Sequence, residues 1–280
     1  MPTYTDSYGV DITYYEWTVS EPRAVVQLVH GLGEHAQRYG ALAEALSRAG
    51  YSVYAEDHRG HGQTGLAQHG GDLSRLGRLG PGGLRATFAA VHQFTALVRD
   101  ANPGVPIVLL GHSFGSIIAQ VLLNTHSADY AAVVLTGTAA RLPGLMNGGD
   151  LNRLHKHLGT TGREWLTRDL DVQRAFDDDP LTFPADARKL FGLVDGRRLF
   201  GVPARNLPSR LPLLIQIGSE DSLGGERSVR RLADLYRRRS GLTDVQVQVY
   251  PEARHEVFNE LNRDEVIGDL LAWLNAHIAH

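Results

Sequence analysis

Short apolar runs and segments of helical periodicity alternate along most of this chain. The short runs predict strands at residues 11–17, 24–29, 51–55, 105–110, 130–136, 213–217 and 245–249. Apolar residues at helical spacing predict helices at residues 41–49, 84–99, 227–239 and 264–278, with a glycine-rich loop over 60–83. This alternation is typical of an α/β fold in which a mostly parallel central sheet carries helices on both faces.

The alternation stops between residues 137 and 210, where no strong strand pattern occurs. This stretch carries a mixed helical pattern at 151–166 and an acidic run at 177–179. About seventy residues of different character inside a regular series are more typical of an inserted unit than of a loop. We therefore predict a core formed by residues 1–136 and 211–280, interrupted by a mainly helical cap, or lid, at residues 137–210.

Composition narrows the class of protein. The chain has 280 residues, a net charge of −3 and no cysteine, which excludes disulfides, thiolate catalysis and cysteine-ligated zinc. No basic surface for nucleic acid is expected, because the densest basic run, residues 237–239, ends a predicted helix. No signal peptide and no membrane-spanning run is visible, so we expect a cytoplasmic protein.

The stretch Gly111-His112-Ser113-Phe114-Gly115 stands between a predicted buried strand and an apolar helix. A Gly-x-Ser-x-Gly sequence in that setting is typical of a nucleophile elbow, in which the serine is exposed on a tight turn. Such a serine adopts a strained backbone conformation that its surroundings must enforce. From this motif alone, a merely structural Gly-Ser turn remains the alternative.

A serine hydroxyl becomes a good nucleophile only when a base takes its proton and a carboxylate orients that base. In this fold class the base is a histidine that follows the serine and the acid along the chain. His255 follows the predicted strand at 245–249 after a short loop, whereas His277 and His280 lie in the last helical turn and the tail. His255 is therefore the predicted base for Ser113.

The orienting acid is expected just beyond the strand at 213–217, at the carboxyl end of a parallel strand. Glu220 and Asp221 both lie there. We predict Asp221, because a Gly218-x-x-Asp turn is the usual layout in this fold class, and Glu220 is the competing candidate.

A second glycine-containing motif, residues 30–35, follows the strand at 24–29. We expect the N–H of Leu32 in this motif and the N–H of Phe114 to form an oxyanion hole. A dinucleotide site is disfavoured because the third glycine of its fingerprint is missing. Zinc is disfavoured because the histidine pairs 30/35 and 58/61 lack an evident third ligand. We therefore expect neither a metal nor a cofactor.

Together these motifs resemble those of the monoacylglycerol lipase and lysophospholipase family, within the α/β-hydrolase superfamily of serine hydrolases. The matching stretches are residues 30–35, 57–62, 111–115, 171–181, 218–221 and 254–260. The resemblance implies a catalytic triad of Ser113, His255 and Asp221, with oxyanion donors at Leu32 and Phe114. The sequence also departs from the family pattern at one position, because Phe114 stands where a methionine is usual.

The resemblance also implies roles for two polar residues and for the cap. Glu34 and Arg38 match polar positions near the alcohol-binding mouth of the family, although either could simply solvate its loop. Leu145 and Met146 lie in the cap with a leucine stripe at residues 151, 154 and 158. These apolar residues either cover the core or form the roof and rim of an acyl-chain tunnel that contacts lipid aggregates.

We therefore predict a serine esterase or lipase that hydrolyses monoacylglycerols or similar single-chain carboxylic esters through an acyl-serine intermediate. A general carboxylesterase for small or aromatic monoesters and an aminopeptidase- or amidase-like hydrolase are the alternatives within the enzyme class. A non-catalytic binding module is the alternative outside it. The expected partner is a small-molecule ester, with peripheral membrane contact and no nucleic acid. The sequence gives no indication of an oligomeric state.

Overall fold

One mixed sheet organises the chain, of which the computed structural model describes residues 1–278. Eight strands hydrogen-bond in the order β1-β2-β4-β3-β5-β6-β7-β8, parallel from β4 to β8, with β1 and β2 antiparallel to their neighbours. Their bounds are β1 Thr3–Thr5, β2 Asp11–Trp17, β3 Ala24–Val29, β4 Tyr51–Glu56, β5 Ile107–His112, β6 Ala132–Thr136, β7 Leu213–Gly218 and β8 Val245–Tyr250. The seven predicted strands are confirmed, and β1 is an additional short edge strand.

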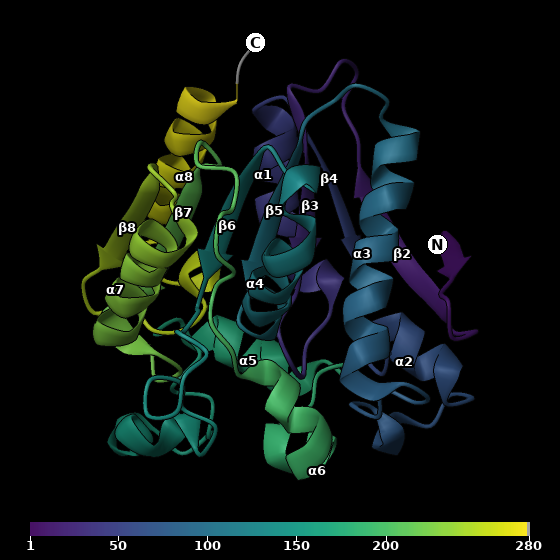
Figure 1. Cartoon of the computed structure of the whole chain (residues 1–280). Helices are drawn as coiled ribbons and strands as arrows, with labels where there is room; N and C mark the ends of the chain where they lie inside the picture. The colour runs from purple at the N-terminus through teal and green to yellow at the C-terminus, as the bar shows by residue number, and fades with distance from the viewer. Residues whose placement is uncertain (279–280) are drawn as a thin grey trace.

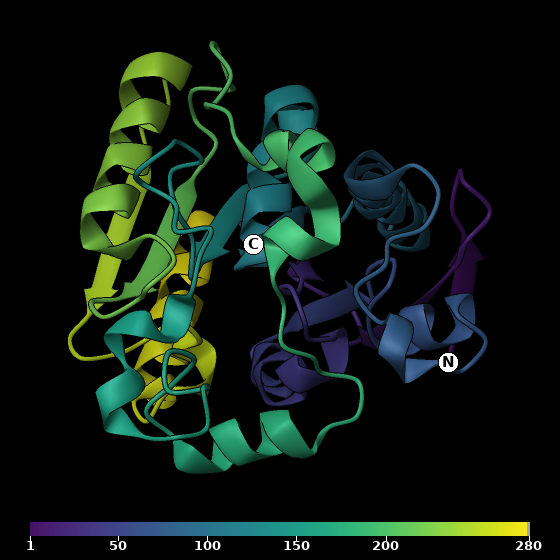
Figure 2. The same ribbon diagram turned by 90° about the horizontal axis from the view of Figure 1, so that it is seen from below.

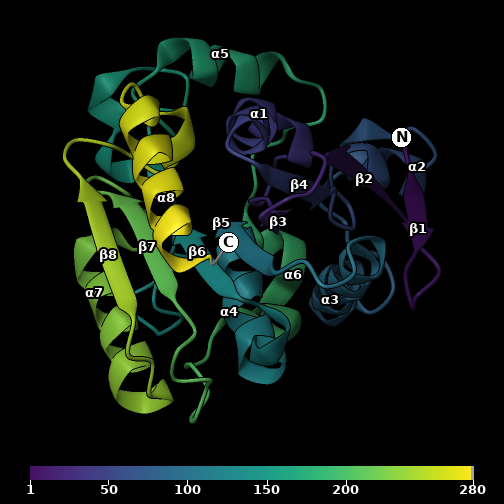
Figure 3. The same ribbon diagram turned by 90° about the horizontal axis from the view of Figure 1, so that it is seen from above.

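Helices cover both faces of this sheet (Figures 1 and 3). On one face lie α1 and α8, and on the other lie α3, α4 and α7, each group packed on its own apolar cluster. Strands β3 to β7 are buried along their whole length, which explains their continuous apolar sequences. The helices are α1 Gly40–Arg48, α3 Gly83–Ala101, α4 Phe114–His126, α7 Gly225–Leu235, continued by a π-turn at Tyr236–Ser240, and α8 Arg263–His277. Within residues 1–278 no helix is long and apolar enough to cross a membrane.

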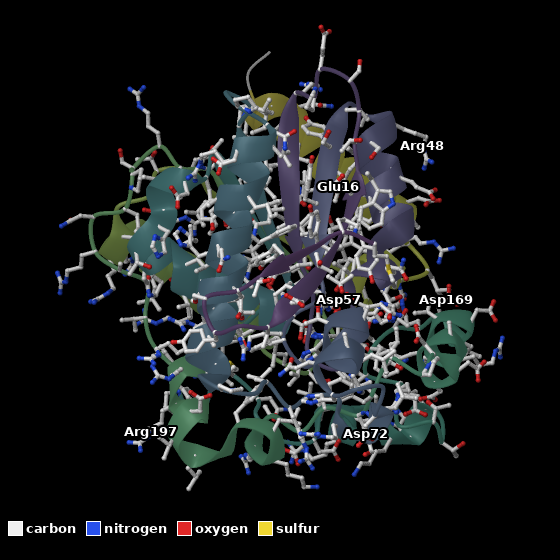
Figure 4. The ribbon with its side chains drawn as sticks, turned by 90° about the vertical axis from the view of Figure 1, so that its right-hand side faces the viewer. Glu16, Arg48, Asp57, Asp72, Asp169 and Arg197 are labelled. Atoms are coloured by element: carbon white, nitrogen blue, oxygen red, sulfur yellow. The ribbon has the colours of Figure 1, made fainter. Side chains whose placement is uncertain are left out.

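The prediction of a loop over residues 60–83 is wrong in part, because this region contains helix α2 (Gly62–Gln68) and a 3-10 turn at Leu73–Arg75. Glycine lowers the intrinsic helix propensity of α2, so periodicity did not reveal it. Tertiary contacts stabilise it instead. The buried Asp57 carboxylate accepts a 2.8 Å hydrogen bond from Gln63 N and another, of 2.9 Å, from Ala36 N (Figure 4).

The chain between β6 and β7, residues 137–212 and hereafter the β6–β7 segment, lies at the carboxyl ends of the parallel strands (Figures 1 and 2). It contains helices α5 (Leu170–Asp178) and α6 (Ala187–Gly196), which the periodicity did not predict. Each begins at an aspartate whose side chain accepts hydrogen bonds from the first-turn amides, namely Asp169 and Asp186. Local capping therefore starts both helices.

The mixed helical stretch predicted at residues 151–166 forms only 3-10 turns, at Leu151–Leu154 and Lys156–Leu158. Gly159 then takes a fully extended conformation that ends the second turn. The leucines of this stretch are not a buried stripe, because Leu154 and Leu158 are 62% and 46% exposed. The interpretation that they cover the core is therefore wrong for these two residues.

Candidate active site

Ser113 occupies the turn between β5 and α4 with φ 51° and ψ −119°, the strained conformation expected of a nucleophile elbow. The flanking glycines make this turn possible. A Cβ on Gly111 would lie 2.5 Å from Gly115 O, and a Cβ on Gly115 would lie 1.9 Å from Val29 O. A larger residue at either position would therefore push the helix away from the strands.

His255 and Asp221 approach each other from two neighbouring strand ends, since they follow β8 and β7 respectively. His255 Nδ1 lies 3.0 Å from Asp221 Oδ2, and both side chains are buried. The other oxygen, Asp221 Oδ1, accepts a 2.7 Å hydrogen bond from Leu223 N, which fixes the carboxylate. The competing candidate, Glu220, is exposed, and it is Asp221 that contacts His255 Nδ1.

The second ring nitrogen of His255, Nε2, is buried and has no hydrogen-bond partner within residues 1–278. The ring packs against Trp165 and His112, with centroid distances of 4.8 and 4.9 Å. Burial by itself lowers the pKa of His255, but the charges of Asp221 and of two further carboxylates outweigh it and raise the pKa above 6.5. An oriented imidazole with one free nitrogen can act as a general base.

The two predicted oxyanion donors lie at the start of α4 and in the loop after β3, hereafter the oxyanion loop (residues 30–35). Neither Leu32 N nor Phe114 N donates to another group of the described chain. The loop is close to the serine, because a Cβ built on Gly31 would lie 3.2 Å from Ser113 Cβ. Two unpaired amides beside the serine are what stabilisation of an oxyanion requires.

Glu34 and Arg38 form a buried network with Glu256, so the interpretation that they only solvate the loop is wrong. Arg38 Nη1 lies 2.5 Å from Glu34 Oε2 and 2.8 Å from Glu256 Oε1, and its Nη2 donates at 2.9 Å to Glu256 Oε2. Glu34 Oε1 in turn accepts a 2.6 Å hydrogen bond from Gly31 N in the oxyanion loop. One arginine thus links the oxyanion loop to the residue that follows His255.

Glu256 is a site residue that sequence reasoning missed, although it lies inside one of the motifs that carry the resemblance. Burial by itself raises the pKa of Glu256, but the Arg38 guanidinium outweighs this and holds the pKa at about 2. Glu256 is therefore charged near neutral pH, and it shares the Arg38 guanidinium with Glu34.

A cavity of about 420 Å³ contains Ser113 and His255 in its wall together with Glu34 and Glu256. Its remaining wall comes largely from the β6–β7 segment and is mostly apolar, including Met146, Leu151, Trp165, Leu166, Phe176, Phe183, Phe191 and Leu199. Met146 thus lies in the cavity wall, whereas Leu145 packs against the apolar core. The wall therefore combines polar groups next to the catalytic residues with a mostly apolar surface that suits a hydrocarbon chain.

The histidines considered for zinc have other surroundings. His30 and His58 are fully buried and stack at 3.8 Å between centroids, and burial lowers the pKa of His30 well below its ordinary value. His35 Nε2 instead contacts Asp179 Oδ2 of the β6–β7 segment at 2.8 Å. Of the tail histidines, His277 lies at the end of α8 and His280 lies outside the described residues.

Comparisons with known proteins extend the similarity to the whole chain. A family model described as Hydrolase_4 (serine aminopeptidase, S33) matches residues 20–262. A monoacylglycerol lipase of Mycolicibacterium smegmatis is 34% identical over 96% of this chain and 95% of its own length. The monoglyceride lipase of Rattus norvegicus is 26% identical over 100% of this chain and 90% of its own. A solved carboxyl esterase from Bacillus coagulans, in complex with glycerol, has a TM-score of 0.84 at 26% identity and covers 99% of this chain and 98% of that one.

Proposed function

The chain belongs to the Hydrolase_4 (serine aminopeptidase, S33) family of α/β-hydrolases as a monoacylglycerol lipase-like serine ester hydrolase, and we propose that it cleaves monoacylglycerols with Ser113 as nucleophile. In this proposal His255 is the general base, Asp221 orients it, and the N–H groups of Leu32 and Phe114 bind the oxyanion. The substrate is a small-molecule ester, and neither a metal nor a cofactor takes part in the reaction.

The observation that carries the proposal is the environment of His255. Its Nδ1 lies 3.0 Å from the Asp221 carboxylate, while its Nε2 is left without a partner in the wall of the cavity that also contains Ser113. An unpaired buried polar atom costs about 1–3 kcal/mol. Within the described chain His35 Nδ1 and His61 Nε2 are also buried without a partner, but of these three histidines only His255 shares the cavity wall with Ser113. An unpaired Nε2 beside a strained serine supports a catalytic role.

In the proposed mechanism, Ser113 Oγ transfers its proton to His255 Nε2 as it bonds to the ester carbonyl carbon. The carbonyl oxygen becomes an oxyanion and accepts hydrogen bonds from the N–H groups of Leu32 and Phe114. When the C–O bond to the alcohol breaks, the imidazolium gives its proton to the departing alkoxide. Water then attacks the acyl-serine by the same route and releases the fatty acid and the free enzyme.

The two glutamates in the cavity wall support a polyol as the alcohol part of the ester. Glu34 and Glu256 lie in the cavity wall as hydrogen-bond acceptors, and the cation that they share, Arg38, is already bound to both. Hydroxyl groups that donate hydrogen bonds suit such a surface, and glycerol offers two of them in a monoacylglycerol. The mostly apolar remainder of the wall supports an acyl chain, of which each buried methylene contributes up to ~0.8 kcal/mol.

We propose that residues 137–210 act as a cap whose outer face contacts lipid aggregates or membranes. Several of its large apolar side chains are exposed, above all Leu193 (87%) and Val194 (76%) of α6. Apolar side chains exposed together on one helix are typical of an interaction surface. This outer face replaces Leu145 as the rim in the proposal, because Leu145 packs inward on the core.

A substrate panel tests the proposal. The purified protein is assayed with monoacylglycerols of increasing chain length, a soluble butyrate ester and an aminoacyl amide. We expect kcat/KM to rise with acyl length until the cavity is filled and the amide to remain uncleaved. Faster cleavage of the amide would favour the aminopeptidase-like alternative, and a flat response to acyl length would favour a general carboxylesterase.

A further inference from the structure

A cluster of three potential metal ligands lies outside the catalytic apparatus. His92 comes from α3, His126 from the last residue of α4, and Asp129 from the 3-10 turn Ser127–Asp129 that follows it. Their ligand atoms all lie within 4.8 Å of one another. Ser113 precedes α4 and His126 ends it, so the 13 residues of this helix separate the cluster from the nucleophile by about 20 Å.

The three side chains are held in contact before any ion binds. His92 Nε2 lies 2.9 Å from Asp129 Oδ2, and the imidazoles of His92 and His126 stack at 3.5 Å between centroids. Arg99 Nη2 lies 2.9 Å from the other oxygen, Asp129 Oδ1, and so fixes the carboxylate without covering Oδ2. The side chains of His92 and Asp129 are 31% and 25% exposed, which leaves a path for an ion from solvent.

We propose that His92, His126 and Asp129 bind a borderline divalent cation, with Zn²⁺ as the best fit. Two imidazoles and one carboxylate are ligands that zinc prefers, with water completing a tetrahedral site. Magnesium and calcium are poorer fits because they require more oxygen ligands than a single carboxylate supplies. Arg99 would act as the outer partner that orients the Asp129 carboxylate.

Besides the geometry of the cluster, the pKa of His126 agrees with this role near neutral pH. Metal binding requires a neutral imidazole nitrogen with a free lone pair. Burial and the neighbouring His92 lower the pKa of His126 below its ordinary value, although Asp129 acts in the opposite direction. Within the described chain no hydrogen bond engages the His126 ring, which stacks on the ring of His92.

Binding requires a local rearrangement of side chains. Ligands of one zinc ion lie about 2.0–2.2 Å from it, so the present spacing of up to 4.8 Å has to close. The stacked rings must also tilt apart, because each lone pair lies in the plane of its ring. His92 must carry its proton on Nδ1 so that Nε2 can bind the ion in place of its contact with Asp129. The ion would then tie α3 to the end of α4.

Calorimetric titration of the metal-free full-length protein with ZnCl₂ at neutral pH tests the proposal. We expect one ion per chain for the wild type. We expect a loss of affinity of at least about tenfold for His92→Ala and for His126→Ala, since even outer-shell changes cost 10–100-fold. The matched control is His157→Ala, which removes an exposed histidine of the β6–β7 segment and should bind zinc like the wild type.

Thermal unfolding gives a second readout that does not depend on activity. Saturating zinc should raise the Tm of the wild type and of His157→Ala, but not that of His126→Ala, because a ligand that binds only the folded state stabilises it. Ester hydrolysis should be unchanged in all three variants without added metal. The proposal is overturned if the wild type binds no stoichiometric zinc, if His126→Ala binds it equally well, or if Mg²⁺ and Ca²⁺ bind as tightly.

Discussion

Arg38 is the residue at which the buried charges around the cavity can be tested most sharply. Its side chain is 10% exposed and is the shared cation of Glu34 and Glu256, whose side chains are 4% and 5% exposed. Replacement by methionine retains most of the volume and removes the charge. Two carboxylates then remain buried without a cation, which is the costly way to break an ion pair.

The pKa of Glu256 gives the magnitude. Although burial alone raises it, Arg38 holds the pKa at about 2, against an ordinary value of 4.5. At ~1.4 kcal/mol per pKa unit, this difference corresponds to about 3 kcal/mol of folding free energy near pH 7. Because the folded-state pKa is depressed, this stability is fully present above pH 4.5 and is lost as the pH falls through about 2.

Urea unfolding at pH 7 measures the effect, with Arg48→Met as the matched control. Arg48 forms the same i,i+4 pair, with Glu44 at 3.7 Å, but the two side chains are 72% and 65% exposed, and Arg48 extends into solvent (Figure 4). We expect Arg38→Met to lose about 3 kcal/mol and Arg48→Met less than about 0.5 kcal/mol. Equal losses in the two variants, or a loss for Arg38→Met below about 1 kcal/mol, would refute the reasoning.

Three further outcomes follow from the same geometry. Asp221→Asn should lower kcat by about 10⁴ through the wrong imidazole tautomer, whereas Glu220→Gln should leave it nearly unchanged in steady-state assays. The kcat/KM of a soluble ester should rise with pH through a midpoint above 6.5, because protonated His255 cannot accept a proton and the pKa of His255 is raised. A midpoint below 6.5 in the pH-rate profile would contradict this expectation. The double variant Leu193→Asp with Val194→Asp should slow hydrolysis of aggregated long-chain esters far more than that of a soluble butyrate ester, since both side chains are exposed. If the variant slows both reactions by the same factor, these side chains do not contact lipid.

The parts of the site that could be predicted from sequence are those with local signals. The elbow around Ser113 shows itself in five consecutive residues, and the sheet order then brings the ends of β7 and β8 together. That order explains why chain position alone predicts the contact between Asp221 and His255. The buried strands were predicted for a similar reason, since shielding on both faces leaves a continuous apolar run.

The parts that could not be predicted depend on contacts between distant residues. Arg38 meets Glu256 across 218 positions of sequence, and no local pattern shows that these charges are buried together. Helix α2 is rich in glycine and is stabilised by contacts such as that of Asp57 with Gln63 N, so propensity and periodicity both pointed to a loop. The cluster of His92, His126 and Asp129 likewise forms only when α3 and α4 pack side by side.

Covalent labelling with a fluorophosphonate tests the central claim most directly. The reagent bonds to a serine oxygen only where a base activates it and an oxyanion hole binds the phosphoryl oxygen. We expect mass spectrometry of the digested protein to find one adduct, on the peptide that contains Ser113. The adduct should be absent from a folded Ser113→Ala variant and form far more slowly in His255→Ala. No adduct on the wild type, or an adduct that persists in Ser113→Ala, would contradict the assignment of Ser113 as the nucleophile.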